Sequence, residues 1–431
     1  MTEVIKRPAA DSPPGSPPPE PEQPPLRRNR AFRLIWVGSA FSLLGLEAAD
    51  VVYPLVVLGL TGSPGWAGLF GAVQLTASVL AGLPVGELLD RHHPRRLLVA
   101  AEGLRLLATT SVAVALGLHE LTLVQLFVVA VLLGLVQPFS GGARMVALRT
   151  AVPKEQLTAA LTADEVRSGA ASLAGPPLGG VLLGVARMLP FVATAAFFLV
   201  STLTAVFLRL PEKEQPAPRA EAGPAPRYWT RMFAGMGAVW QDVTVRGAVL
   251  LVAVLNAAGA PLVLVVLVVL RRHGTPAWQM GLVMAALALG GLVGAALVGP
   301  LHGRLRPGVL LLGLGVVEAA MFALLTLGWG PAWVAAVLFL SMLPVPALRV
   351  LVDVLIFRQV PAELRGRVIA GVMTLFTLGA PAGVALSGLL LQTLSARSAL
   401  LVLAAVVAAA VLVALRSRTL RAARWPQDDG H

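Results

Sequence analysis

Residues 121–143 read LTLVQLFVVAVLLGLVQPFSGGA and contain no Asp, Glu, Lys or Arg. A helix that crosses a membrane needs about 20 mainly apolar residues, and this run is long enough. Six further uncharged runs lie along the chain, at 51–86, 188–208, 247–270, 319–348, 368–396 and 398–415. The runs are continuous and do not alternate with polar residues, which excludes a membrane β-barrel. The sequence therefore predicts an all-α membrane protein.

The composition agrees with this class and excludes several others. Of the 431 residues, 57% are hydrophobic and only 13% are charged, against about 25% charged in a soluble domain. The absence of Cys excludes a disulfide framework, a zinc finger and a thiol nucleophile. No P-loop, metal cluster or nucleophile constellation occurs. We therefore expect no enzyme activity, no cofactor and no metal site.

The apolar runs divide into twelve expected spans, because the longer runs contain Gly/Pro turns such as residues 61–65. The expected spans are 33–59, 66–86, 97–118, 121–140, 160–186, 189–209, 247–270, 277–300, 308–328, 332–353, 367–392 and 398–416. Residues 1–32 predict a disordered Pro-rich tail. Residues 210–246 predict a linker that ends in an amphipathic surface helix, with a plain linker as the alternative. Residues 417–431 form a second tail.

The basic residues predict the orientation of the chain. With both termini in the cytoplasm, the inner segments hold 27 of the 34 Lys and Arg residues and the outer loops hold 4. Such an excess on the inner side is the usual signature of a bacterial plasma-membrane protein with this orientation. The net charge of +12 is thereby explained by topology and contact with anionic lipid. We expect no nucleic-acid partner.

An internal repeat predicts how the spans are arranged. Val152-Pro153 corresponds to Val360-Pro361 at an offset of 208 residues, and Glu155 corresponds to Glu363. Two parallel halves of six spans each are a transporter architecture, with the substrate site between the halves near the membrane midplane. The chance matching of common residues is the alternative explanation, which the ordered Val-Pro-x-Glu match disfavours.

Residues 86–96, GELLDRHHPRR, join the second and third expected spans on the cytoplasmic side. The segment resembles the G-x-L-x-D-R-x-G-R-R signature of the major facilitator superfamily. The resemblance implies a short gating loop that uses Gly86, Asp90, Arg91 and Arg95. Asp90 can accept charge-assisted hydrogen bonds, and a contact made in only one state would bias alternating access. The sequence departs from the signature at His93 and Pro94, where Gly and Arg are usual.

Residues 175–180, GPPLGG, end the fifth expected span. They resemble the G-P-x-x-G-G motif of drug and metabolite antiporters in the same superfamily, carried by Gly175, Pro176, Gly179 and Gly180. Small residues allow close helix packing, and Pro can kink a helix. Close packing without any role in antiport is the alternative interpretation.

The segments 144–157 and 359–368 resemble the enterobactin-exporter-like branch, also called transmembrane secretion effectors. The resemblance extends from Arg33 to Leu415. It implies a monomeric exporter of siderophores, macrolide-like drugs or other metabolites. The Arg often found inside the fourth span of proton antiporters is missing from 121–143, so proton coupling is expected to use other residues.

Ionisable residues inside spans are candidates for function, because burying a charge in hydrocarbon is costly. Glu47 and Asp50 lie three residues apart on one helix face and are candidates to carry protons or to hold a cationic group. A wall position in a wet cavity is the alternative. Glu102 and Arg105 have the same spacing and are further candidates for proton coupling or substrate binding, although a structural ion pair is the favoured interpretation. Glu318 is a further candidate in the second half.

These observations favour a secondary transporter that exports a small amphipathic molecule, driven by proton entry. An uptake symporter is the first alternative, and the branch and the motif at 175–180 disfavour it. A non-transporting membrane sensor or assembly protein is the second alternative. Such a protein would not need acidic residues inside its spans.

Overall fold

The computed structural model describes residues 25–82, 84–210, 243–300, 307–347 and 379–417. Within these ranges, ten helices are long and apolar enough to cross a membrane. Shorter helices cover 331–347 and 379–393. Each of the twelve expected spans therefore has a helix within its described part, which is 332–347 for the tenth span and 379–392 for the eleventh. The described residues contain no β-strand, and the expected all-α membrane class is confirmed.

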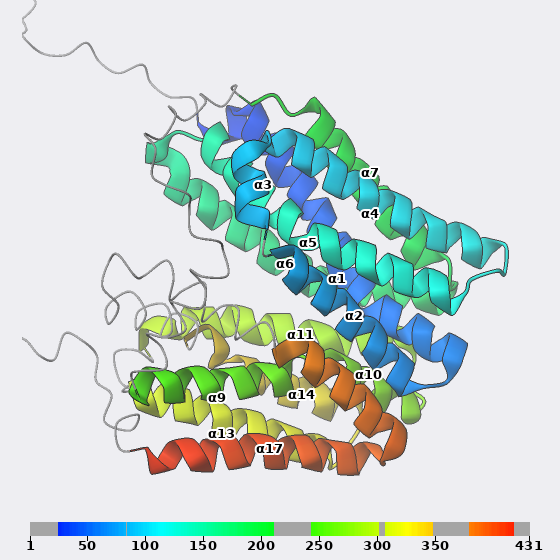
Figure 1. Ribbon diagram of the computed structural model, residues 1–431, viewed down its shortest axis with the longest axis vertical. Helices are drawn as coiled ribbons and strands as arrows, with labels where there is room; N and C mark the ends of the chain where they lie inside the picture. The colour runs from blue at the N-terminus through cyan, green and yellow to red at the C-terminus, as the bar shows by residue number, and fades with distance from the viewer. Residues whose placement is uncertain (1–24, 83, 211–242, 301–306, 348–378, 418–431) are drawn as a thin grey trace, which may run out of the picture.

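The first half of the chain forms one body of helices, the upper one in Figure 1. Its helices are α1 (Arg30–Thr61), α2 (Pro64–Gly82), α3 (Val85–Arg91), α4 (Pro94–Gly117), α5 (Leu123–Ala151), α6 (Leu157–Val185) and α7 (Leu189–Phe207). Two single turns of 3₁₀-helix, Leu26–Arg28 and Lys154–Gln156, precede α1 and α6. Helix α1 packs along α6 and α7.

The second half forms the lower body in Figure 1. Its helices are α9 (Val243–Gly259), α10 (Leu262–Arg272), α11 (Ala277–Ala296), α13 (Pro307–Leu325), α14 (Pro331–Met342), a helix over 379–393, and α17 (Ala396–Arg416). The seventh expected span is broken at Ala260 and Pro261. Pro261 lacks a backbone N–H and so cannot continue the helical hydrogen bonds.

Capping residues set several helix ends. The Asn29 side chain accepts a hydrogen bond from the backbone N–H of Phe32 at 3.0 Å and begins α1. Gly62 ends α1 in the left-handed conformation, with φ +66°. Thr122 and Ser395 cap α5 and α17 in the same way as Asn29.

Helix α5 is longer than the sequence predicted. The fourth span was expected to end at residue 140, but α5 continues to Ala151. Residues 141–151 contain few helix breakers, and Ala143, Ala147 and Leu148 form a buried stripe at helical spacing. The helix therefore continues beyond the uncharged run, and Arg144 lies on it.

The two bodies approach each other at the right of Figure 1, opposite the end of the bundle at which α1 begins and α17 ends. A Cβ atom at Gly68 would lie 2.7 Å from the Cα atom of Gly388, so the backbones of α2 and the helix over 379–393 are in contact. The hydroxyl of Ser63 donates to the amide oxygen of Gln392 at 3.2 Å. Small residues thus close this end, which we call the far end.

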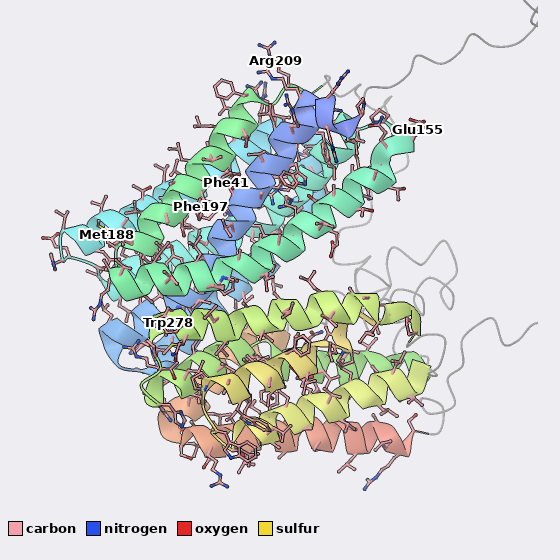
Figure 2. The ribbon with its side chains drawn as sticks, turned by 180° about the vertical axis from the view of Figure 1, so that it is seen from behind. Phe41, Glu155, Met188, Phe197, Arg209 and Trp278 are labelled. Atoms are coloured by element: carbon pink, nitrogen blue, oxygen red, sulfur yellow. The ribbon has the colours of Figure 1, made fainter. Side chains whose placement is uncertain are left out.

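Large apolar side chains cover the outside of the bundle (Figure 2). Leu107, Val124 and Val413 are between 68% and 74% exposed. A water-soluble protein rarely exposes large contiguous apolar patches. The exposed surface therefore fits contact with lipid.

Candidate functional site

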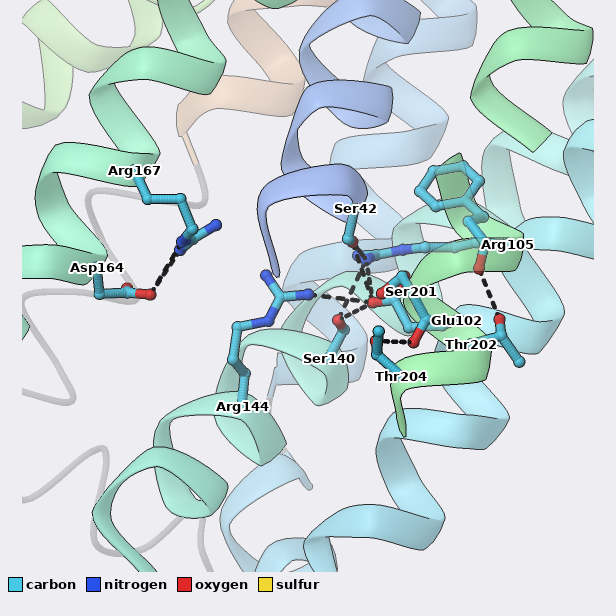
Figure 3. A network of polar contacts seen from close by, with 11 residues as sticks. Ser42, Glu102, Arg105, Ser140, Arg144, Asp164, Arg167, Ser201, Thr202 and Thr204 are labelled. Atoms are coloured by element: carbon cyan, nitrogen blue, oxygen red, sulfur yellow. Dashed lines mark hydrogen bonds and ion pairs between the residues drawn. The ribbon is translucent and has the colours of Figure 1, made fainter. Parts of the chain in front are cut away.

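A buried polar network lies between α1, α4 and α5, and Glu102 is at its centre (Figure 3). Glu102 is 1% exposed. Its Oε1 atom accepts hydrogen bonds from Ser140 at 2.6 Å and Ser42 at 3.1 Å. The same oxygen pairs with Arg105 at 2.9 Å and Arg144 at 3.3 Å. Four donors from three helices therefore converge on one carboxylate oxygen.

Arg105 is the largest fully buried side chain in the described part of the structure. Its Nη1 atom also donates to Ser42 at 3.2 Å and to Ser140 at 3.1 Å. Its guanidinium carbon lies 5.9 Å from the centre of the Phe198 ring, within range of a cation–π contact. The ion pair between Glu102 and Arg105 expected from their spacing is present.

Helix α6 adds a second ion pair close to this network. Arg167 donates to Asp164 Oδ1 from Nε at 3.1 Å and from Nη2 at 2.7 Å. The Arg167 side chain is buried, and its guanidinium points towards Arg144 in Figure 3. Sequence reasoning missed the grouping of Arg144 with Arg167. The helical spacing of the apolar residues Ala143, Ala147 and Leu148 could have predicted that the helix continues and carries Arg144.

Glu47 and Asp50 lie outside this network, further along α1. Glu47 Oε1 accepts a hydrogen bond from the Ser172 hydroxyl of α6 at 2.6 Å. Asp50 is exposed, whereas Glu47 is half-buried. The pair therefore has one carboxylate that is hydrogen-bonded to α6 and one accessible carboxylate.

The glycine-rich motif of α6 packs against both halves of the molecule. A Cβ atom at Gly179 would lie 2.7 Å from the carbonyl oxygen of Ala48, so α6 and α1 are in backbone contact there. Gly175 contacts Glu47 and Ala48 in the same way. Gly180 faces Ala277 and Gly281 of α11.

Helix α6 continues through Pro176 and Pro177, and the carbonyl of Pro176 faces Gly281. Through this motif, α6 contacts both the segment of α1 that carries Glu47 and helix α11 of the second half.

The segment at 86–96 differs from the loop that we expected. Residues 85–91 form the short helix α3, and only His92 and His93 separate it from α4. The His93 side chain accepts from the backbone N–H of Arg95 at 3.3 Å, and Pro94 occupies the first turn of α4. His93 and Pro94, the two residues that depart from the family signature, therefore lie at the start of α4. A capping side chain and a Pro are both favourable there.

Arg95 contacts its own half of the molecule. Its Nη2 atom donates to the carbonyl oxygen of Val206, in the last turn of α7, at 2.5 Å. A cation is favourable at a helix C-terminus. Arg91 is exposed. The surroundings of Gly86 and the side chain of Asp90 lie outside what the structure describes. The gating role of this motif therefore stays a prediction.

Glu318 of α13 faces the end of α9. A Cβ atom at Gly259 would lie 3.3 Å from Glu318 Oε1, which is buried and has no hydrogen-bond partner among the described residues. This position directs Glu318 towards the break between α9 and α10. No group of three metal-ligating side chains occurs within the described ranges.

A cavity of about 250 Å³ lies at the far end, between the halves. It is lined by α1, α10 and α11, and by Arg187 and Arg271. Arg271 Nη1 crosses from α10 to the carbonyl oxygen of Leu55 in α1 at 2.9 Å. Arg272 instead donates to the carbonyl of Leu391 in its own half.

Comparisons with known proteins agree with this arrangement. A family model of the Major Facilitator Superfamily matches residues 35–348. The enterobactin exporter EntS of Citrobacter koseri is 30% identical over 330 residues, which cover 74% of each chain. The Salmonella typhimurium exporter of the same name is 28% identical over 333 residues, with the same coverage.

Solved structures share the fold at low identity. The nucleoside transporter NupG aligns with a TM-score of 0.73 at 11% identity, covering 89% of this chain and 99% of the other. A bacterial homologue of the iron transporter ferroportin, in an inward-facing state, aligns with a TM-score of 0.69 at 18% identity, covering 91% and 99%.

The protein is therefore a multi-pass membrane transporter of a small molecule and not an enzyme. The chain belongs to the major facilitator superfamily.

Proposed function

We propose that this transporter exports a small amphipathic molecule from the bacterial cytoplasm by alternating access, in exchange for protons. The proposed cargo is a siderophore, a drug or a secondary metabolite. The proposed protein is a monomer in the plasma membrane with both termini in the cytoplasm. The observation that carries the direction of transport is the 30% identity to an enterobactin exporter over 330 residues.

The contacts between the halves support alternating access. The halves touch through Gly68 and Gly388, and through Gly180 and Gly281, at the far end. With the orientation predicted from the basic residues, the far end is the outer one. The conformation then corresponds to a transporter closed to the outside, and rocking of the halves would open it.

The position of Glu47 supports a role in proton coupling. A proton carrier must exchange between charged and neutral forms and must also sense the state of the transporter. Glu47 is bonded to Ser172 of α6, and the same helix contacts α11 of the other half through Gly180. Movement of the halves would therefore alter the surroundings of the Glu47 carboxyl. Asp50 is the proposed second acid, exposed to water and to cargo.

The proposal is tested by drug susceptibility and dye accumulation in cells with and without the gene, each repeated with a protonophore. Export predicts lower accumulation in cells that carry the gene, and a protonophore should abolish the difference. Higher accumulation in those cells would instead indicate uptake. An effect that persists with the protonophore would reject proton coupling while retaining export.

A further inference from the structure

Two arginines from different helices face each other near the end of the bundle at which α1 begins and α17 ends. Arg144 lies seven residues before the end of α5, and Arg167 lies ten residues after the start of α6. At 1.5 Å per residue, both are roughly 10–15 Å from their helix ends. Figure 3 shows the two guanidinium groups directed towards one another. They are close enough for their charges to repel.

The charges around these arginines do not balance. The described cluster contains three guanidinium groups, of Arg105, Arg144 and Arg167, but only two carboxylates, of Glu102 and Asp164. Both ion pairs to Glu102 use Oε1, which also accepts from two serines. One positive charge therefore remains without a counter-charge among the described residues.

Arg167 has an unused donor. Its Nε and Nη2 atoms are bound to Asp164, and its buried Nη1 atom has no hydrogen-bond acceptor in the described part of the chain. The whole residue is only 6% exposed. Leaving such a group unpaired away from water is unfavourable, and a guanidinium is well suited to bind planar or tetrahedral oxyanions.

We propose that Arg144 and Arg167 form an anion site that binds a carboxylate, sulfonate or phosphate group of an amphipathic cargo. The inference rests on the proposed function, because the ligand is taken to be the transported molecule. The Arg144 guanidinium lies between Arg167 and Glu102 in Figure 3, so it would separate an anion bound at Arg167 from the Glu102 carboxylate. The apolar part of the cargo would extend away from the arginines.

Two fluorescent probes test the site directly. 1-Anilinonaphthalene-8-sulfonate and N-phenyl-1-naphthylamine share an aromatic framework, and only the first carries an anionic group. Each is titrated into the full-length protein in phosphatidylcholine nanodiscs, with empty nanodiscs subtracted. We expect Arg144→Gln and Arg167→Gln to weaken binding of the sulfonate about tenfold. Binding of the uncharged probe should change less than about twofold.

The variant Asp164→Asn separates binding from a structural role. It replaces the carboxylate that competes for Arg167 with a neutral amide, which is a weaker acceptor, and raises the net charge of the cluster, so sulfonate binding should become several times tighter. A purely structural role for the pair would weaken binding in this variant as well. Arg96→Gln is the matched control, because Arg96 is an exposed arginine at the start of α4. It should leave both probes unaffected.

Several outcomes would overturn the site. The first is that the Arg144→Gln and Arg167→Gln variants lose affinity for both probes equally. The second is that these variants bind the sulfonate as the wild type does. The third is that Asp164→Asn binds the sulfonate more weakly. If the Gln variants do not fold, Asp164→Asn and Arg144→Lys, which should retain most sulfonate binding, still decide the question. If added phosphatidylglycerol displaces the sulfonate from the wild type, the site belongs to a lipid headgroup and the assignment to cargo is wrong.

The proposed function can fail separately. If the binding pattern holds but cells with the gene extrude no compound, the anion site stands and export is rejected. If export is observed but the two probes do not discriminate among the variants, export stands and the anion site is rejected.

Discussion

Glu102 neutralises one buried arginine, Arg105, and one partly buried arginine, Arg144, so its charge should be essential to the stability of the first half of the molecule. Glu102→Gln keeps the size of the side chain but leaves Arg105 and Arg144 without their carboxylate. Breaking a buried ion pair in this way costs about 3–5 kcal/mol. We expect a marked fall in the thermal unfolding midpoint of the detergent-solubilised protein. Glu120→Gln, at an exposed turn, is the control. Identical melting curves for the wild type and Glu102→Gln would contradict this account.

Glu47 is the residue on which we expect proton coupling to depend. Glu47→Gln mimics the protonated form and can keep a hydrogen bond with Ser172. It should bind cargo but fail to drive export against a gradient. Asp50→Asn should have a milder effect, because Asp50 is exposed.

Proton movement on addition of cargo to proteoliposomes measures the coupling, with Ser172→Ala as a control that retains the carboxylate. Full coupling in Glu47→Gln would exclude Glu47 as the carrier and leave Glu102 and Glu318 as the next candidates.

The sequence predicted part of the polar network. The spacing of Glu102 and Arg105 predicted their ion pair, because residues three apart lie on one helix face. Arg144 could not be assigned to this network, because the fourth span was expected to end at residue 140 and Arg144 lies beyond that residue. Ser42 and Ser140 are single hydroxyls in apolar helices, and no sequence pattern distinguishes them from other serines. Which side chains meet across helices depends on helix rotation, which hydropathy does not determine.

The glycine face of α6 provides a test at the level of the helix. A side chain at Gly180 would collide with the backbone of α11 at Ala277 and Gly281, whereas one at Gly184 would meet nothing within 4 Å. Gly180→Val should therefore separate the halves at the far end, and Gly184→Val should not.

The chain has no native Cys, so a Cys pair at Ser63 and Gln392 can report this closure by disulfide crosslinking. Equal crosslinking in the two Val variants would show that this helix contact does not hold the far end closed.

Neighbouring arginines at the end of α10 allow a second comparison. Arg271 binds the carbonyl of Leu55 in the other half, and Arg272 binds Leu391 in its own half. Arg271→Gln should lower the yield of the same Cys crosslink, because it removes a charge-assisted contact between the halves. Arg272→Gln should preserve the yield. The opposite ranking would mean that Arg271 does not act as a latch.

The helices themselves were more predictable than their ends. Every expected span contains a helix in the part that the structure describes, because length and apolarity decide membrane spanning. The sequence also indicated the short connection at 86–96 but not the helix within it. Residues 85–91 can form a helix because His93 and Pro94 supply a separate start for α4, a function that the family signature does not predict.

The orientation of the whole molecule is tested by reporter fusions. Fusions after Leu118 and after Gly328 should report the outside, and fusions after Glu221 and at the C-terminus should report the cytoplasm. The reason is that the expected inner segments hold 27 Lys and Arg residues, whereas the expected outer loops hold 4. Termini on opposite sides of the membrane would contradict both the number of spans and the proposed direction of transport.

The length of α1 has a consequence for the membrane around the protein. Its 32 residues extend about 48 Å, whereas the hydrocarbon core of a bilayer is about 30 Å thick. Figure 1 shows α1 running obliquely through the upper body. A helix of this length fits its surroundings by tilting or by deforming nearby lipid. The proposed rocking of the halves would change that tilt, so acyl-chain length would contribute to the free-energy difference between the two proposed states of the transporter.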